Sequence, residues 1–268
     1  MVKFVAKKGV NLESLEELEL LIGNPKIKNK KKDSFTLKDG DLKLEIEGSG
    51  FDYIGGIPVS GKIEKIEAFQ SGKLAYTLKK LNLKISDLGS FGSVEDALAS
   101  ILKGDDRLIG SDKKDTLLGF NGDDVIKGNK GGDTLGGQKG KDTLKGGNGK
   151  DVLDGGENKD TLEGGKGKDS FAFTTAADGK GDRILDFEAG ERILLDNNVF
   201  DVGAAGATLD PSLFVEGSEA TNANHRIVAL ESKGKIWYDD DGDGANAKVL
   251  LAKVTPGTNL DADNFFVI

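Results

Sequence analysis

The chain has 268 residues, a formal net charge of −9, 39 glycines, one histidine and no cysteine. The missing cysteines exclude disulfides and thiolate metal sites, and the single histidine, His225, excludes a His-rich zinc site. A bound metal ion would therefore have oxygen ligands, as calcium, magnesium and manganese do. The acidic excess lies toward the C-terminal end, which disfavours a nucleic-acid partner, and no apolar run is long enough for a membrane span.

Residues 1–100 predict a small α+β domain, or a cap for the segment that follows. Apolar spacings of three and four over 12–22 predict a short helix, and a capping box at 93–96 predicts a second helix through Leu102. Alternating apolar residues predict strands over 35–37 and 42–46, joined by a turn at Asp39-Gly40. The segments 74–78 and 81–85 alternate in the same way. The lysine-rich run 26–32 is interpreted as a solvated loop, with contact to an anionic surface as the alternative.

From residue 101 the chain divides into eight consecutive nine-residue units, ending at residue 172. We number the places within a unit from one to nine. Place six is always aspartate, and place eight is always a large apolar residue. The aspartates are Asp106, Asp115, Asp124, Asp133, Asp142, Asp151, Asp160 and Asp169, and the apolar residues are Leu108, Leu117, Ile126, Leu135, Leu144, Leu153, Leu162 and Phe171.

The pattern predicts stacked coils. Glycines at places one, two and four permit tight turns with positive φ, and their carbonyl oxygens lie beside the aspartate in the sequence. The apolar residue at place eight needs neighbouring units to bury it, so stability builds along the array. Oxygen donors from two stacked turns suit calcium.

These units resemble the G-G-x-G-x-D-x-U-x nonapeptide of the RTX (repeats-in-toxin) calcium-binding family. The resemblance implies a mainly β chain, with a right-handed parallel β-roll over 101–172 and a β-rich C-terminal cap over 173–268. It also implies at most six calcium ions, each between one turn and the turn two units later. Carbonyls at places two and four with the aspartate would come from the first turn, and carbonyls at places one and three with the aspartate from the second.

The ligand set implied by the resemblance spans all eight units. Its members are Gly104, Asp106, Asp115, Gly119, Phe120, Asn121, Gly122, Asp124, Gly128, Asn129, Lys130, Gly131, Asp133, Gly137, Gln138, Lys139, Gly140, Asp142, Gly146, Gly147, Asn148, Gly149, Asp151, Gly155, Glu157, Asp160, Gly164, Lys166 and Asp169.

Some units depart from the pattern. The first unit keeps few glycines and is interpreted as a cap, Lys113 replaces the fourth-place glycine of the second unit, and Asn158 replaces it in the seventh. Asparagine tolerates positive φ better than other non-glycine residues. Five units have lysine at place five. Because these charges screen the acidic turns, we expect folding to depend less on calcium than in an all-acidic roll.

Beyond the repeats, Asp178 keeps the nine-residue phase but Lys180 breaks the apolar pattern, so the role of Asp178 stays open. Strands are predicted over 226–230 and 235–238, with a turn at 231–234. Residues 239–244 begin like an EF-hand loop, but Leu250 stands at its twelfth position and no helix pattern flanks it. An acidic turn is the preferred interpretation, and a weaker calcium site is the alternative.

Residues 260–268 combine acids with an apolar tail, which resembles the type I secretion signal of RTX proteins; a last strand of the cap is the other interpretation, and both can hold. Residues 1–10 lack the apolar run of a Sec signal peptide. The resemblance therefore implies a secreted, extracellular, non-enzymatic protein that calcium folds after export by type I secretion machinery. Two alternatives are an adhesin or matrix protein whose N-terminal domain binds a glycan or surface, and a small polysaccharide-acting enzyme with an RTX tail.

Overall fold

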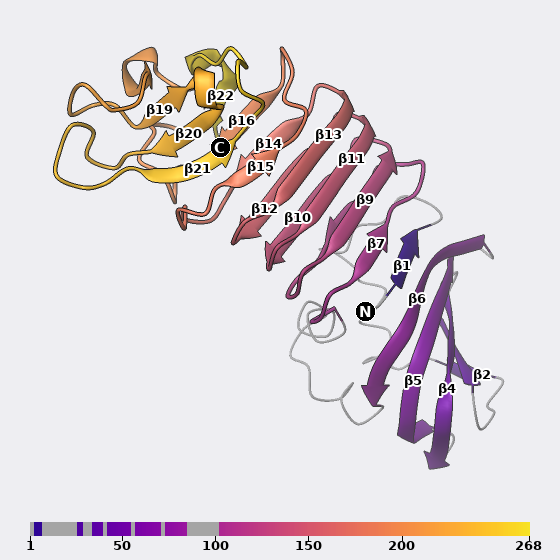
Figure 1. Cartoon of the computed structure of the whole chain (residues 1–268). Coiled ribbons are helices and arrows are strands. Elements are labelled where there is room, and N and C mark those ends of the chain that lie inside the picture. The colour runs from indigo at the N-terminus through magenta and orange to yellow at the C-terminus, as the bar shows by residue number, and fades with distance from the viewer. Residues whose placement is uncertain are drawn as a thin grey trace.

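The computed structural model describes residues 3–6, 26–28, 34–39, 42–54, 57–70, 73–84 and 102–268. These residues form two β-sheets, and the described part contains no α-helix, only three short 3-10 turns. Strands of the repeats lie side by side through the middle of the molecule, with the N-terminal strands at one end and the C-terminal strands at the other (Figure 1). No helix among the described residues is long and apolar enough to cross a membrane.

The repeats and the segment that follows them form a parallel β-solenoid of five coils, each of which contributes one strand to each sheet. The first sheet contains β7 (Arg107–Ile109), β9 (Val125–Lys130), β11 (Thr143–Gly149), β13 (Thr161–Gly167) and β15 (Asp182–Ile184). The second contains β8 (Thr116–Leu118), β10 (Thr134–Lys139), β12 (Val152–Glu157), β14 (Ser170–Phe173) and β16 (Arg192–Leu195). Successive units therefore alternate between the two sheets, as the nonapeptide pattern predicts.

The place-eight residues form the core of the solenoid. Leu144 pairs in register with Ile126 and Leu162, each 18 residues away, and Leu135 pairs with Leu153 in the other sheet. All eight place-eight side chains are 0–1% exposed. One side chain per unit is thus removed from water by its neighbours, which confirms the predicted apolar pattern and explains why single units do not fold alone.

The coils continue beyond residue 172 with a changed step. Leu162 pairs with Ile184 and Phe171 with Ile193, so the register moves by 22 residues where the preceding coils move by 18. Ile184 and Ile193 are 1% and 0% exposed, and they extend the apolar core by one coil.

The N-terminal strands continue the first sheet. They are β1 (Lys3–Ala6), β2 (Lys26–Lys28), β3 (Ser34–Asp39), β4 (Leu42–Ile54), β5 (Ile57–Gln70) and β6 (Lys73–Lys84). β2 to β6 form an antiparallel meander, and β1 joins β6 to the first coil by pairing parallel with β7. The edge of β7 is thereby covered, as expected for a cap.

The structure tests three predictions for the N-terminal residues, with different outcomes. The turn near Asp39-Gly40 is confirmed, because β3 and β4 pair antiparallel across it. The strand pattern of 74–78 and 81–84 is confirmed, and both segments belong to one strand, residues 73–84, that pairs with β5. The loop prediction for 26–32 was wrong for Lys26–Lys28, which pair with β3. The helices predicted over 12–22 and 93–102 lie outside the described residues, except for Leu102.

The C-terminal strands cap the other end. They are β17 (Ala207–Thr208), β18 (Phe214–Glu216), β19 (Ile227–Leu230), β20 (Lys235–Tyr238), β21 (Val249–Lys253) and β22 (Phe265–Val267). The 3-10 turns are η1 (Pro211–Leu213), η2 (Glu231–Lys233) and η3 (Ala262–Asn264). The predicted hairpin β19–β20 is confirmed, with Gly234 at φ 59° in the left-handed region. β22 pairs with β16 on one side and with β17 on the other, so the last strand of the chain extends the second sheet and β17 forms its edge.

Candidate metal centre

The place-six aspartates are joined in two ladders along the two edges of the solenoid. One carboxylate oxygen, Oδ1, accepts a hydrogen bond from the backbone N–H of the aspartate 18 residues earlier. The N–H of Asp133 donates to Asp151 at 2.8 Å, and that of Asp151 donates to Asp169 at 2.9 Å. The other edge repeats this contact from Asp142 to Asp160 at 2.7 Å. Each of these carboxylates is therefore fixed in orientation by the preceding coil.

The second carboxylate oxygen has no hydrogen-bond partner and is buried. This holds for Oδ2 of Asp124, Asp133, Asp142, Asp151, Asp160 and Asp169. An ionised carboxylate buried without a cation or donor is costly, so the proton is held more tightly. Burial raises the pKa of Asp124 and Asp160 to about 8, and neighbouring carboxylates add to the rise. These oxygens lack the positive charge that would stabilise them.

A carbonyl oxygen from the next coil approaches four of these free oxygens, those of Asp124, Asp133, Asp142 and Asp151. A Cβ atom placed on Gly146 would lie 2.5 Å from Oδ2 of Asp151 and 2.6 Å from the carbonyl oxygen of Gly164. The same pair of groups surrounds Gly119, Gly128 and Gly137. The place-one glycine therefore leaves room for a carboxylate and a carbonyl that converge on one point. None of these glycines has positive φ, so the prediction that place one needs a glycine for its backbone conformation was wrong.

Within the repeats, positive φ is confined to places two and four. Gly147 and Gly149 have φ of 114° and 155°, and a side chain on either would collide with the carbonyl oxygen of Asn129 or Gly131 in the previous coil. Four other residues adopt positive φ without being glycine: Phe120, Asn129 and Gln138 at place two and Asn158 at place four. Asn158, at φ 87°, fills its turn as expected. The carbonyls of both places face along the stack toward the next turn.

The first two units differ from the rest. Oδ2 of Asp115 accepts hydrogen bonds from the backbone N–H of Ser111 at 2.6 Å and from its hydroxyl at 3.0 Å. Neither Gly104 nor Lys113 has the positive φ of other fourth places. The two units that depart from the pattern in sequence thus also differ in structure, and Ser111 supplies donors to the oxygen that lacks them in later units.

Both ladders continue past the repeats at two residues that sequence reasoning did not select. The N–H of Asp160 donates to Asp182 at 2.9 Å, and Glu191 lies beside Asp169 at the end of the other edge. Burial raises the pKa of both acids to about 7. The signal was available: Asp182-Arg-Ile184 and Glu191-Arg-Ile193 are nine residues apart and repeat places six to eight after a four-residue insertion.

Asp178, whose role the sequence left open, lies outside these ladders. Its carboxylate accepts from the backbone N–H of Lys180 at 2.9 Å and pairs with the Lys180 ammonium at 2.8 Å. These contacts lower the pKa of Asp178, although partial burial opposes them. Asp186 also ends a turn, since it accepts from the N–H groups of Gly164 and Gly165 at 2.9 and 2.8 Å.

The lysines of the turns lie on the outside. Lys130 pairs with Asp112 at 2.6 Å, and Lys139 pairs with Glu157 at 3.3 Å. Each pair joins neighbouring coils through side chains that are more than half exposed, where ion pairs contribute little to stability. The ammonium groups therefore do not replace a cation between the buried aspartates.

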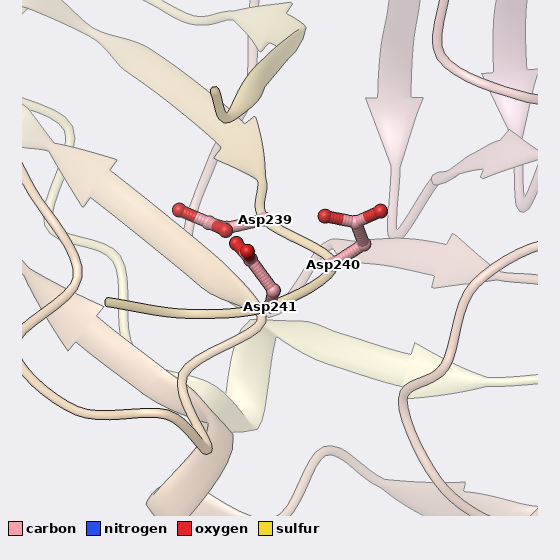
Figure 2. Close-up of side chains that lie close together, drawn as sticks. All are labelled: Asp239, Asp240 and Asp241. Atoms are coloured by element: carbon pink, nitrogen blue, oxygen red, sulfur yellow. The ribbon is translucent and has the colours of Figure 1, made fainter. Parts of the chain in front are cut away.

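A second acidic group lies outside the ladders, after β20. The carboxylates of Asp239, Asp240 and Asp241 have oxygens within 4.8 Å of one another (Figure 2). Burial raises the pKa of Asp239, and the charge of Asp241 adds to this. No α-helix flanks this loop, so an EF-hand is not formed.

The ladder residues fit calcium. They offer buried carboxylate and carbonyl oxygens, which are hard donors, and at four turns a free carboxylate oxygen and a carbonyl oxygen of the next coil converge. Residues 103–135 and 136–171 match the model of the RTX calcium-binding nonapeptide repeat, in four copies. RTX repeats bind calcium, and proteins that contain them are typically secreted. No curated protein sequence matches the chain significantly.

Solved structures with a similar shape include two subunits of a mannuronan C5-epimerase from Azotobacter vinelandii. The AlgE6R3 subunit is 25% identical with a TM-score of 0.33, and the similarity covers 61% of this chain and 78% of that subunit. The AlgE6R2 subunit is 25% identical with a TM-score of 0.24, and the similarity covers 59% of this chain and 90% of that subunit.

Proposed function

Because residues 103–171 are RTX calcium-binding nonapeptide repeats, we propose that this chain is a secreted protein whose β-roll is completed by calcium after export. The observation that carries the proposal is the row of buried Oδ2 atoms without partners. A fold that buries six such carboxylates without a cation is disfavoured at neutral pH, and calcium removes that cost.

The proposed sites follow the ladders. Each would use two carboxylates from successive turns of one edge, together with carbonyl oxygens of the places that the resemblance implies. The pairs are Asp124 with Asp142, Asp133 with Asp151, Asp142 with Asp160, Asp151 with Asp169, Asp160 with Asp182, and Asp169 with Glu191. The pairs beginning at Asp106 and Asp115 are left out because the first two turns have a different geometry.

Binding linkage gives these sites control over folding. A ligand that binds only the folded state stabilises it by RT ln(1 + [L]/Kd), which is about 1.4 kcal/mol per site at tenfold excess over Kd. Six independent sites would add about 8 kcal/mol by this relation, which is comparable with the total stability of a domain. Low cytosolic calcium would then keep the chain loose for export, and extracellular calcium would fold it.

We propose a binding role, not a catalytic one, for the ladders. The place-six aspartates are 0–2% exposed, and one oxygen of each is committed to a neighbouring turn or Ser111. A substrate would not reach them. The C-terminal residues 260–268 would act as the secretion signal before folding, because Phe265 and Val267 are 0% and 1% exposed in the folded cap.

The test is a calcium titration of the full chain followed by circular dichroism, with magnesium as the ionic control. A variant with Asp133, Asp142 and Asp151 changed to Ala is titrated in parallel, after chelation of any metal retained from expression. We expect a β signal that rises with calcium, not with magnesium, and that is strongly reduced in the variant. An identical signal in chelator and in calcium would reject calcium as the folding ligand.

A further inference from the structure

The loop between β20 and β21 gathers three acids that the repeats do not include. Asp239, Asp240 and Asp241 follow one another directly, and their carboxylate oxygens lie within 4.8 Å of one another. Figure 2 shows the carboxylates of Asp239 and Asp241 pointing toward each other across the start of the loop. Within residues 102–268 no lysine or arginine forms a salt bridge with any of the three.

Two of these carboxylates have buried oxygens with no partner. Asp239 is 4% exposed, and its Oδ1 makes no hydrogen bond. Oδ1 of Asp241 is also buried and unpartnered, whereas its Oδ2 accepts from the backbone N–H of Asn246 at 2.9 Å. Since buried carboxylate oxygens are normally hydrogen-bonded or bound to a metal, these two atoms require a partner from outside the chain.

Two basic residues that adjoin the loop, Lys248 and Arg226, have other partners. Lys248 pairs with Glu219 and lies 5.3 Å from the ring centroid of Trp237. The Arg226 guanidinium donates to the carbonyl oxygens of Ala223 and His225 and lies 3.6 Å from Asp201. The negative charge of the three acids is therefore not balanced by these side chains.

The loop is held in place from both sides. Gly242 has φ 68°, and a Cβ there would lie 2.4–2.9 Å from backbone atoms of the 222–223 segment, so the two segments are in close contact. The backbone N–H of Asp243 donates to the carbonyl oxygen of Asn222 at 3.2 Å, and the Asn246 side chain donates to Asp240 at 3.2 Å. The carboxylates are thus presented by a fixed backbone.

We propose that Asp239, Asp240 and Asp241 bind a calcium ion that is separate from those of the repeats, with Oδ1 of Asp239 and Oδ1 of Asp241 as ligands and Asp240 supplying a third carboxylate. Calcium accepts six to eight oxygens in irregular geometry, so water from the adjoining surface hollow of about 490 Å³ completes its shell. The ion would secure the β20–β21 connection of the C-terminal cap.

The chain provides its own probe for this site. Trp237 is the single tryptophan, and it stands two residues before Asp239. Terbium binds calcium sites and emits strongly when a nearby indole transfers energy to it. Terbium titration of the full chain, with excitation of tryptophan, therefore reports on this loop more strongly than on distant turns.

Three variants decide the question. Asp241→Asn removes a ligand and keeps the shape, Asp263→Asn removes an exposed carboxylate of the same cap outside the loop and is the matched control, and Asp133, Asp142 and Asp151 changed together to Asn disable repeat sites. We expect Asp241→Asn to weaken the tryptophan-sensitised terbium binding at least tenfold, while Asp263→Asn leaves it within twofold and calcium displaces it in both the wild type and Asp263→Asn.

Circular dichroism of Asp241→Asn checks that the cap is folded, and Asp240→Asn serves as a second ligand variant if it is not. The proposal is overturned if the sensitised signal survives in both ligand variants. It is also overturned if the repeat variant, still folded, loses the signal while Asp241→Asn keeps it, because the terbium would then be in the roll. This outcome is separate from the failure of the proposed function, which the calcium-dependent folding of the repeats tests.

Discussion

Replacing Asp151 by Asn should change stability in opposite directions with and without calcium. Asn keeps an oxygen at Oδ1, which accepts from the N–H of Asp133 at 2.8 Å, and places an NH₂ group where the free Oδ2 lies. That position faces the carbonyl oxygen of Gly164, to which an NH₂ group can donate. The substitution thus removes the charge and preserves the ladder.

The size of the stability change without calcium follows from the pKa of Asp151. Burial raises the pKa of Asp151 from 3.8 to about 6 in the folded chain, and the charge of Asp169 adds to this rise. A raised folded-state pKa means that stability is lost as pH rises from the unfolded value through the folded one, so at pH 7.5 the whole penalty is present. At about 1.4 kcal/mol per pKa unit this penalty is at most about 3 kcal/mol. Asn removes it, so the free energy of unfolding should rise by about 1–3 kcal/mol in chelator.

With calcium the sign reverses. Asp151 would take part in two proposed sites, with Asp133 and with Asp169. At hundredfold excess over Kd, losing both sites costs about 5 kcal/mol of stability. Because the substitution also removes the penalty of about 1–3 kcal/mol, the net fall in the free energy of unfolding should be about 2–4 kcal/mol in saturating calcium.

The assay is urea denaturation followed by circular dichroism, in calcium and in chelator. If the roll is already partly unfolded in chelator, the fraction of folded protein at zero urea is compared instead. Asp112→Asn is the control, because Asp112 is exposed and only pairs with Lys130 on the surface. Its effect should stay within about 1 kcal/mol under both conditions. Equal destabilisation by Asp151→Asn in both conditions would refute the reasoning, because the carboxylate would then serve only as a hydrogen-bond acceptor.

Three further results are expected. Gly146→Ala should lower the free energy of unfolding in calcium by several kilocalories per mole, measured by urea titration, because the added Cβ occupies the point where Asp151 and Gly164 converge. Gly104→Ala should be nearly neutral, because a Cβ there has nothing within 4 Å. In chelator, lowering the pH from 8 to 5 should increase the β signal in circular dichroism, because Asp124 and Asp160, with pKa values of about 8, become protonated. Calcium affinity, measured by titration, should fall over the same pH range. Changing the exposed Lys141, Lys150 and Lys159 to Ser should lower the fraction folded in chelator, measured by circular dichroism, because unscreened repulsion between acids increases.

The sequence predicted the solenoid because its repeat is a strict period. Place eight is apolar in every unit, and the stack buries each of these residues, so fold and core followed from spacing alone. The continuation at Asp182 and Glu191 was missed because Asp178 keeps the nine-residue phase and hides the four-residue insertion. Only the pairing of Ile184 with Leu162 shows that the phase restarts later.

Other features depend on three-dimensional contacts that spacing does not encode. The hydrogen bonds from Ser111 to Asp115 arise within one irregular turn, and they remove a free oxygen that the other units retain. The role of the place-one glycine depends on a carboxylate and a carbonyl from different coils meeting over its Cα atom. Residues 73–84 form one strand because β5 offers a partner of matching length.

The alternation of units between two edges limits how such a chain can change in length. Adding or removing 18 residues inserts or deletes one whole coil, lengthens or shortens both sheets by about 4.8 Å, and leaves every remaining aspartate on its own edge. A nine-residue change would instead exchange the edges for everything that follows. Asp182 would keep its partner Asp160 and β22 its partner β16, because these residues move together. The C-terminal cap would, however, be turned over relative to the N-terminal strands, which join the array at β7. Duplications of two units therefore preserve the relative orientation of the two ends, whereas duplications of one unit do not.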